Sequence, residues 1–173
     1  MAGITDAEFL NKVIPFGFDT ATLGGYSLDA KTIEASEKII KRGRNEFHFP
    51  QDEIVNHIEK EVNLIKKQHP NVKVSANVRS TTPRPIIEVS NIDNLDIVEI
   101  NCHCRQDEIL AIGCGQNMLK RDDLAEYIGD VVDNDIDNII EQCAGALCMV
   151  KRTNAFRIDT ITLTGTTGEL YIT

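Results

Sequence analysis

Tryptophan is absent from this 173-residue sequence, and aromatic residues make up only 5% of it. The chain therefore lacks the aromatic side chains that stack on bases in a surface for single-stranded nucleic acid. It also lacks an apolar run of about 18 residues, the length of a membrane-spanning helix, so we expect no membrane partner. Basic residues are few as well, because 18 Lys and Arg stand against 27 Asp and Glu, a net charge of -9. A nucleic acid would have to bind a local basic patch.

No secretory signal is recognisable, and the cysteines number five, which is odd. This combination favours free thiols in a reducing compartment, so we expect a cytoplasmic protein. Hydrophobic residues make up 42% of the chain and charged residues 26%, which is enough for one sizeable core. No internal repeat, low-complexity tract or linker divides the sequence, which predicts a single domain over residues 1–173.

Helical and strand patterns alternate along the first 132 residues. Apolar residues at helical spacing, with capping residues at the ends, predict the helices, and short apolar or alternating runs predict the strands. The expected helices cover 6–13, 28–44, 49–67, 83–89, 105–112 and 121–132, and the expected strands cover 18–23, 72–78 and 97–100. Strands that alternate with helices favour βαβ units, so we expect an α/β fold with a parallel sheet.

The pattern changes after residue 132, which makes residues 133–173 an atypical part of the domain. Residues 133–142 are predicted to be helical and residues 146–150 to form a strand. Residues 156–173 alternate in a way that predicts a hairpin around residues 165–168. A glycine-containing turn of this kind can also hold a phosphate through its backbone N–H groups, but the hairpin is the favoured interpretation.

Reactive side chains follow the predicted strand 97–100. Asn101 ends the strand, and Cys102, His103 and Cys104 come directly after it. The carboxyl ends of parallel strands are where α/β proteins bind ligands, so we expect function at this turn. The glycine pair 24–25, which follows another predicted strand, is either an ordinary turn or a ligand loop.

Four short segments in three regions of the chain carry a family resemblance. Residues 99–105 read EINCHCR and residues 113–119 read GCGQNML, residues 1–6 read MAGITD, and residues 75–78 read SANV. The first pair resembles the Asp-Ile-Asn-x-Gly-Cys-Pro and Gly-Ala-Gly-x-x-Leu-Leu segments of the dihydrouridine synthase family. MAGITD is similar to the Met-Ala-Gly-Val-Thr-Asp of that family, and SANV is similar to the segment in which it has a flavin-binding Gln. Over residues 1–132 the chain thus resembles the archaeal, methanogen-type members.

The resemblance implies an FMN-dependent TIM barrel that reduces the C5–C6 double bond of uridine in tRNA, with NAD(P)H as reductant. Cys104 would be the catalytic acid, and Asn101 and Arg105 would contact the substrate. The residues expected at the flavin are Met1, Ala2, Gly3, Asn77 and Lys151. About 250 residues are usual for eight βα units, so the length predicts a shortened or partial (β/α) barrel with parallel strands. Unpaired sheet edges in such a barrel would favour a homo-oligomer.

Other readings stay open at this stage. The chain could be a non-catalytic, truncated relative that keeps the fold without the cofactor. It could be a flavoenzyme similar to dihydroorotate dehydrogenase, with a small pyrimidine as substrate. It could instead be a metal-binding module, because thiolate and imidazole ligands suit soft metals. The ligands of that module would be Cys102, His103, Cys104 and Cys114.

Overall fold

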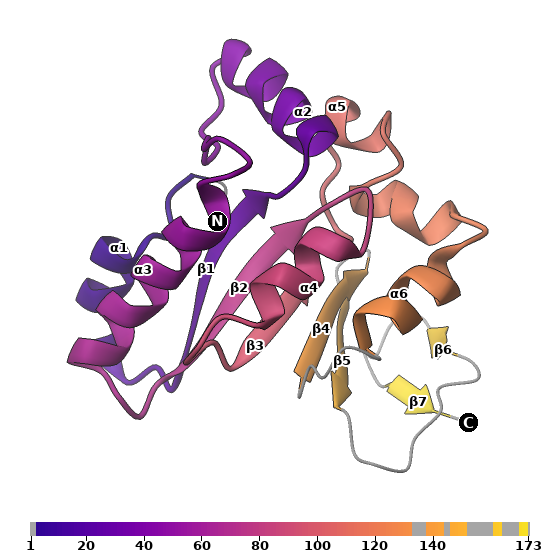
Figure 1. Cartoon of the computed structure of the whole chain (residues 1–173). Coiled ribbons are helices and arrows are strands. Elements are labelled where there is room, and N and C mark those ends of the chain that lie inside the picture. The colour runs from indigo at the N-terminus through magenta and orange to yellow at the C-terminus, as the bar shows by residue number, and fades with distance from the viewer. Residues whose placement is uncertain (1–2, 133–137, 144–145, 152–160, 164–169, 173) are drawn as a thin grey trace.

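The computed structural model describes the backbone of residues 3–132, 138–143, 146–151, 161–163 and 170–172, and the side chains of residues 3–132 (Figure 1). Its elements follow one another along the chain in this order: α1 (Ala7–Val13), η1 (Ile14–Phe16), β1 (Thr20–Ser27), α2 (Ala30–Lys41), α3 (Ile54–Gln68), β2 (Lys73–Arg79), α4 (Arg84–Ser90), β3 (Ile97–Ile100), α5 (Asp107–Leu110), η2 (Gly115–Lys120), α6 (Leu124–Val132), β4 (Asn138–Cys143), β5 (Ala146–Lys151), β6 (Ile161–Leu163) and β7 (Leu170–Ile172).

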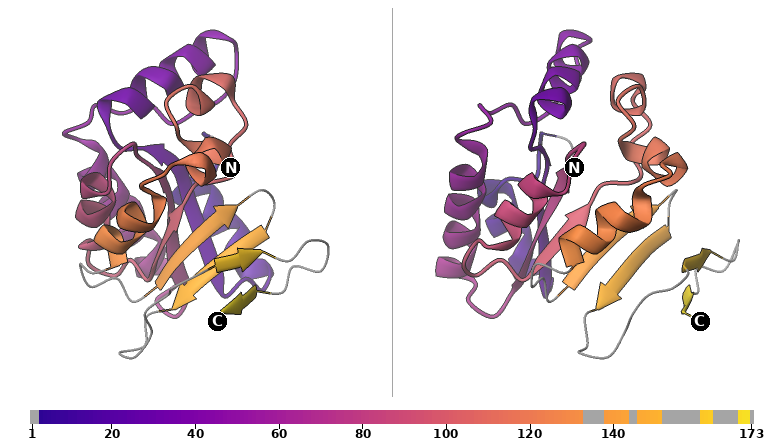
Figure 2. Two further views of the ribbon diagram at one scale, coloured as in Figure 1. Left: turned by 90° about the vertical axis from the view of Figure 1, so that its right-hand side faces the viewer. Right: turned by 45° about the vertical axis from the view of Figure 1, so that its right-hand side comes forward.

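The main sheet has its strands in the order in which they occur in the chain. The order is β1-β2-β3-β4-β5, with the first four strands parallel and β5 antiparallel to β4. The helices α3, α4 and α6 connect successive parallel strands and lie on one face of the sheet (Figures 1 and 2). The expected α/β fold with a parallel sheet is therefore confirmed. The described strands form an open sheet and not a closed barrel.

The core lies between this sheet and the helices. In α3, buried residues recur at the spacing of one helical face, and they share one hydrophobic core with alternate residues of β2. The core residues of these two elements are Ile54, Ile58, Val62 and Ile65 of α3, and Val74, Ala76 and Val78 of β2. Each fully buried Ile or Val side chain contributes about 1.5–3 kcal/mol, so this layer accounts for much of the stability. The other face of β2 carries Ser75, Asn77 and Arg79, which are also buried but polar.

Helix α2 occupies a different position from the helices that cover the sheet. It lies beyond the carboxyl ends of the strands, beside α5 (Figure 2). Ala35 and Ile39 of α2 form a small second core with Ile109 and Cys114. The Arg42 guanidinium group, just after α2, donates to both carboxylate oxygens of Glu108, at 2.6 and 2.8 Å. These two helices therefore build a separate layer over one edge of the sheet.

Two sequence predictions require correction. Residues 138–142, predicted as helix, belong to β4, and residues 133–137 lie outside the described residues. Pairing with neighbouring strands overrides the local helical pattern here, because β4 pairs with β3 on one side and with β5 on the other. Strand β1 continues through the glycine pair that was predicted to be a loop, as far as Ser27.

The remaining C-terminal predictions agree with the structure where it describes the chain. The predicted strand 146–150 is β5, and the predicted hairpin corresponds to the antiparallel pair β6 and β7. The turn at residues 165–168 lies outside the described residues. Within the described part of the chain, no helix has the length and apolar character needed to cross a membrane.

Candidate functional site at the carboxyl ends of the strands

The parallel strands β1, β2 and β3 bring polar residues together at their carboxyl ends. The register pairs Gly24 of β1 with Asn77 of β2, and Asn77 with Glu99 of β3. Asn101 follows β3 directly. Asn77, Glu99 and Asn101 are 0%, 4% and 7% exposed, so this polar group is buried. Buried amides and carboxyls must find hydrogen-bond partners, and these residues find one another.

A chain of hydrogen bonds runs from Glu99 to the backbone of Cys104. The Asn77 Nδ2 group donates to Glu99 Oε1. Asn101 Nδ2 donates to Asn77 Oδ1 at 2.9 Å, and the Cys104 backbone N–H donates to Asn101 Oδ1 at 3.2 Å. Burial raises the pKa of Glu99 above its ordinary value, although the bond from Asn77 opposes this shift. The residues predicted from sequence at positions 77, 101 and 104 therefore form one connected unit.

The glycine pair in β1 closes this unit from the side. A Cβ atom at Gly25 would lie 2.7 Å from Asn77 Oδ1 and 3.5 Å from Asn101 Nδ2. Both interpretations that the sequence left open, an ordinary turn and a ligand loop, are wrong, because the pair lies within β1. Its lack of side chains is what gives the two amides room to meet.

Cys104 is held by the segment that follows it. Its carbonyl oxygen accepts a hydrogen bond from Gln116 N at 3.0 Å. Gly115 has a φ of 58° and its Cα approaches so closely that an added Cβ would collide with the Cys104 carbonyl oxygen. Cys104 itself is partly exposed. A partly exposed cysteine, which packs against the small core of α2 and α5, thus sits on a backbone that is fixed on both sides.

The other described cysteines are enclosed. Cys102 Sγ contacts Met118 Sδ at 3.4 Å, and Cys114 Sγ lies 3.4 Å from the Ser80 carbonyl oxygen. Burial, helped by the nearby Asp29 carboxylate, raises the pKa of Cys114 to about 11. His103 has a lowered pKa because of burial and the positive charge of Arg105. The described residues contain no group of three or more side chains that could hold a metal ion, so the geometry gives no support to the Cys/His metal module.

Asp29 braces the same edge from the start of α2. Its carboxylate accepts from Thr32 N at 2.9 Å, Ser80 Oγ at 3.0 Å and Thr81 N at 2.6 Å. Burial works against the charged form, but the hydrogen bonds from Thr81 and Thr32 hold the pKa of Asp29 below its ordinary value. Sequence reasoning missed this role, for which the only local signal is a capping box formed with Thr32.

Only some of the other predicted site residues lie at the carboxyl edge of the sheet. Gly3 lies beside the backbone of Glu46, because a Cβ at Gly3 would be 2.7 Å from the Glu46 nitrogen. The Glu46 side chain pairs with Arg79, the last residue of β2, so Gly3 lies at the same edge of the sheet as Asn77. Arg105 is exposed on the loop after Cys104. Lys151 pairs with Asn138 at the amino end of β4, so the register places it at the opposite edge of the sheet. Met1 and Ala2 lie outside the described residues.

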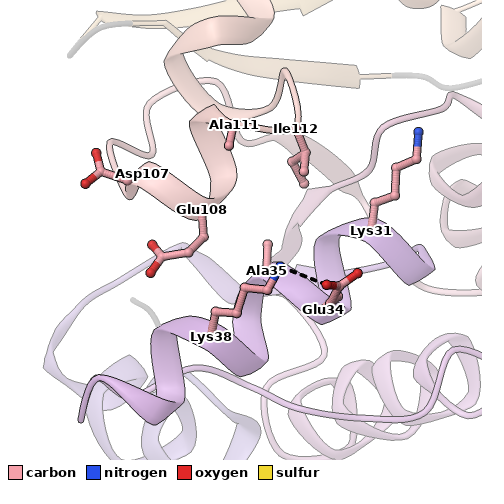
Figure 3. A pocket seen from close by; sticks show the side chains of 8 residues that line it. All are labelled: Lys31, Glu34, Ala35, Lys38, Asp107, Glu108, Ala111 and Ile112. Carbon is pink, nitrogen blue, oxygen red and sulfur yellow. Dashed lines mark ion pairs between the residues drawn. The ribbon is translucent and has the colours of Figure 1, made fainter.

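A groove of about 370 Å³ between α2 and α5 lies outside this unit (Figure 3). The lining residues that carry charge are Lys31, Glu34, Lys38, Asp107 and Glu108. Lys38 and Glu34 satisfy one another at 2.8 Å, and Glu108 is engaged by Arg42. Cys104 does not line the groove. Two carboxylates of the groove, Glu34 and Glu108, are therefore already paired with cations of the chain.

Comparison with known proteins gives one informative match. No protein-family model matches the chain. A segment of 126 residues, 72% of the chain, is 40% identical to "Uncharacterized protein MJ0144" from the archaeon Methanocaldococcus jannaschii. The matched segment spans 48% of that protein, so the chain covers about half of its length. The chain is therefore similar to part of an archaeal protein whose printed name states no activity.

Proposed function

We propose that this chain forms part of an FMN-dependent (β/α) barrel of the dihydrouridine synthase type, which reduces uridine in tRNA. The observation that carries the proposal is the partly exposed Cys104, fixed by Asn101 and Gly115 at the carboxyl edge of a parallel sheet. Sequential strands with their connecting helices on one face are the arrangement from which such barrels are built, which supports the fold assignment.

The polar groups at this edge fit the ring end of a flavin. The hydrogen-bond chain uses one of the two hydrogens on each amide nitrogen of Asn77 and Asn101. Several buried side-chain atoms of the described residues lack a hydrogen-bond partner, and two of them are Ser75 Oγ, two residues before Asn77 on β2, and His103 Nδ1, after β3. Amide, hydroxyl and imidazole groups match the alternating donors and acceptors on a flavin rim. Lys151 lies at the other edge, so the fit is limited to the ring end.

Reduction of the uracil C5–C6 bond adds a hydride to one carbon and a proton to the other. FMN, reduced by NAD(P)H, would supply the hydride when bound. The contribution of the chain is the proton: the S–H bond of Cys104 breaks as a C–H bond forms on the ring, and solvent then reprotonates the thiolate. Asn101 holds the Cys104 backbone in place during this step. Arg105, exposed beside the thiol, would contact the substrate.

The test starts from the visible absorbance of the purified chain before and after incubation with FMN and gel filtration. We expect retained flavin near equimolar occupancy in the native chain and in Cys104→Ala. With NADPH and unmodified tRNA, dihydrouridine formation should fall about 10²–10⁴-fold in Cys104→Ala, the usual contribution of a general acid. The control Cys143→Ala changes a cysteine that has no role in this mechanism and should keep full activity.

Three outcomes would contradict the proposal, each in a different way. A chain that retains no FMN would be a non-catalytic relative. Flavin binding with turnover of dihydroorotate, but not of tRNA, would make it an enzyme of small pyrimidines. Equal activity in Cys104→Ala and the native chain would remove Cys104 from the mechanism.

Cytoplasmic location and self-association stay predictions. Phe16 and Phe18, next to the amino end of the edge strand β1, are 83% and 57% exposed. Exposed aromatic residues beside an open sheet edge favour association, and light scattering during gel filtration would show a dimer or larger assembly if it forms.

A further inference from the structure

The hydrogen bonds between Glu99 and Cys104 have a direction. A backbone N–H can only donate, so Cys104 requires the oxygen of the Asn101 amide. The Asn101 nitrogen must then face Asn77, whose side-chain oxygen accepts the hydrogen bond. The Asn77 nitrogen is left to face Glu99, whose oxygen accepts. Each amide is therefore oriented by its neighbour. The Cys104 N–H at one end and the Glu99 oxygen at the other require the same donor-to-acceptor direction along the chain of bonds.

The reversed order is unfavourable at this site. If both amides flipped, the Asn101 nitrogen would oppose the Cys104 N–H, and the Asn77 oxygen would oppose Glu99. A buried polar group without a hydrogen-bond partner destabilises the folded state. A carboxyl group can accept through an oxygen in either protonation state, so Glu99 supports the observed order whether or not it carries a proton.

We propose that Glu99 is a positioning residue: by accepting from Asn77 it fixes the orientation of both amides, so that Asn101 presents its oxygen to the Cys104 backbone and holds the thiol at the edge of the sheet. This inference rests on the proposed function, because the thiol that Glu99 would position is the proposed catalytic acid, Cys104. Glu99 touches neither the thiol nor the Cys104 backbone in this chain of bonds, and it acts through two intervening amides.

A pair of isosteric substitutions tests the direction of the bonds. Asn101→Asp keeps an oxygen for Cys104 but turns a second oxygen toward Asn77, which must flip and bring its own oxygen against Glu99. The experiment is done at a pH at which Glu99 is ionised, because a protonated Glu99 would donate to that oxygen and restore the bond. Glu99→Gln alone can keep its oxygen toward Asn77 and leaves the order unchanged. In Glu99→Gln/Asn101→Asp the glutamine can donate to the flipped Asn77, and every bond is formed again in the reversed sense.

The readout is the hydrogen-exchange rate of the Cys104 amide, measured by NMR without FMN or substrate. We expect Asn101→Asp to accelerate this exchange at least 10-fold, Glu99→Gln to change it less than 3-fold, and the double variant to return within 3-fold of the native rate. The alkylation rate of Cys104 by iodoacetamide should follow the same pattern, since it reports the position of the thiol.

Equal exchange in Asn101→Asp and the double variant would overturn the inference, because a packing role for Glu99 gives no rescue. If Asn101→Asp does not fold, recovery of the folded state in the double variant supports the inference, and failure of both to fold overturns it. None of these measurements involves a flavin. Loss of the proposed function would leave the coupling between Glu99 and Cys104 standing, and loss of the coupling would leave the FMN assay unaffected.

Discussion

Arg79 and Glu46 form an ion pair in which both side chains are almost fully buried, with exposures of 3% and 4%. The same guanidinium donates to Ser27 Oγ at 2.9 Å and to Ser36 Oγ at 2.8 Å. The pair therefore joins the end of β2 to the segment between α2 and α3. Removal of one partner would leave the other charge in a place that water does not reach.

We expect Glu46→Ala to lower the free energy of unfolding by about 3–5 kcal/mol, the usual cost of an uncompensated buried charge. The matched control is Glu8→Ala, which removes the exposed pair between Glu8 and Lys12 and should have no measurable effect. Urea unfolding followed by circular dichroism measures both. Similar losses in the two variants would show that the Glu46 pair is open to solvent.

Asp29 should make the stability depend on pH. Its pKa is lowered in the folded state, so the carboxylate contributes stability above its ordinary pKa of about 4 and loses it as the pH falls through the folded value. We expect Asp29→Asn to cost about 2 kcal/mol near pH 7, the value for a lost charged hydrogen bond, and less below pH 4. Denaturant titrations between pH 3 and pH 7 measure the difference. A cost that is constant over this range would contradict the prediction.

The described cysteines should differ in reactivity. Cys104 is partly exposed, whereas Cys102 and Cys114 are buried. Because burial raises the pKa of Cys114 to about 11, only about one thiol in a thousand is ionised there at pH 8. We expect iodoacetamide to modify Cys104 at least 10-fold faster than Cys102 or Cys114 in the folded chain. Peptide mass spectrometry resolves the three sites, and in denaturant the differences should vanish.

Gly115 and Gly113 offer a matched pair of substitutions beside Cys104. Both have positive φ angles, 58° and 74°, so alanine costs about 1–2 kcal/mol at either position. At Gly113 a Cβ meets nothing within 4 Å, whereas at Gly115 it collides with the Cys104 carbonyl oxygen. We expect Gly115→Ala to cost at least about 1 kcal/mol more and to shift the Cys104 amide resonance. Equal costs would mean that the contact is looser in solution.

The elements that could be predicted from sequence are those whose signal is local. Helix α3 follows from apolar residues that share one helical face, and β3 from a short apolar run. Strand β4 could not be predicted, because pairing with β3 and β5 decides its conformation. The continuation of β1 through Gly25 likewise depends on pairing with β2, where Tyr26 lies opposite Val78 and Ser27 opposite Arg79.

The residues of the candidate site likewise differ in whether a local sequence signal predicts them. Asn101 and Cys104 stand out because they follow a strand and match a motif, and the structure brings them together. Glu99 lies in the same motif, but its hydrogen bond crosses to another strand and has no sequence signature. The partnership of Arg79 with Glu46 spans 33 residues and was equally invisible. Sequence alone selected Cys104 and Asn101 as candidates, whereas the contacts of Glu99 and Arg79 emerge only from the folded chain.

The sequential order of strands makes the Cys104 unit modular. Neighbours in the sheet are also neighbours in the chain, and the hydrogen-bonded unit draws its side chains from β2, β3 and the turn that follows. An evolutionary gain or loss of strands at the β5 end of the sheet would therefore leave this unit intact, whereas loss of β1 would remove the glycine pair that gives its amides room. Recombination between related genes could then exchange the β4 and β5 end of the sheet while the same thiol, with its oriented amides, is inherited as a block.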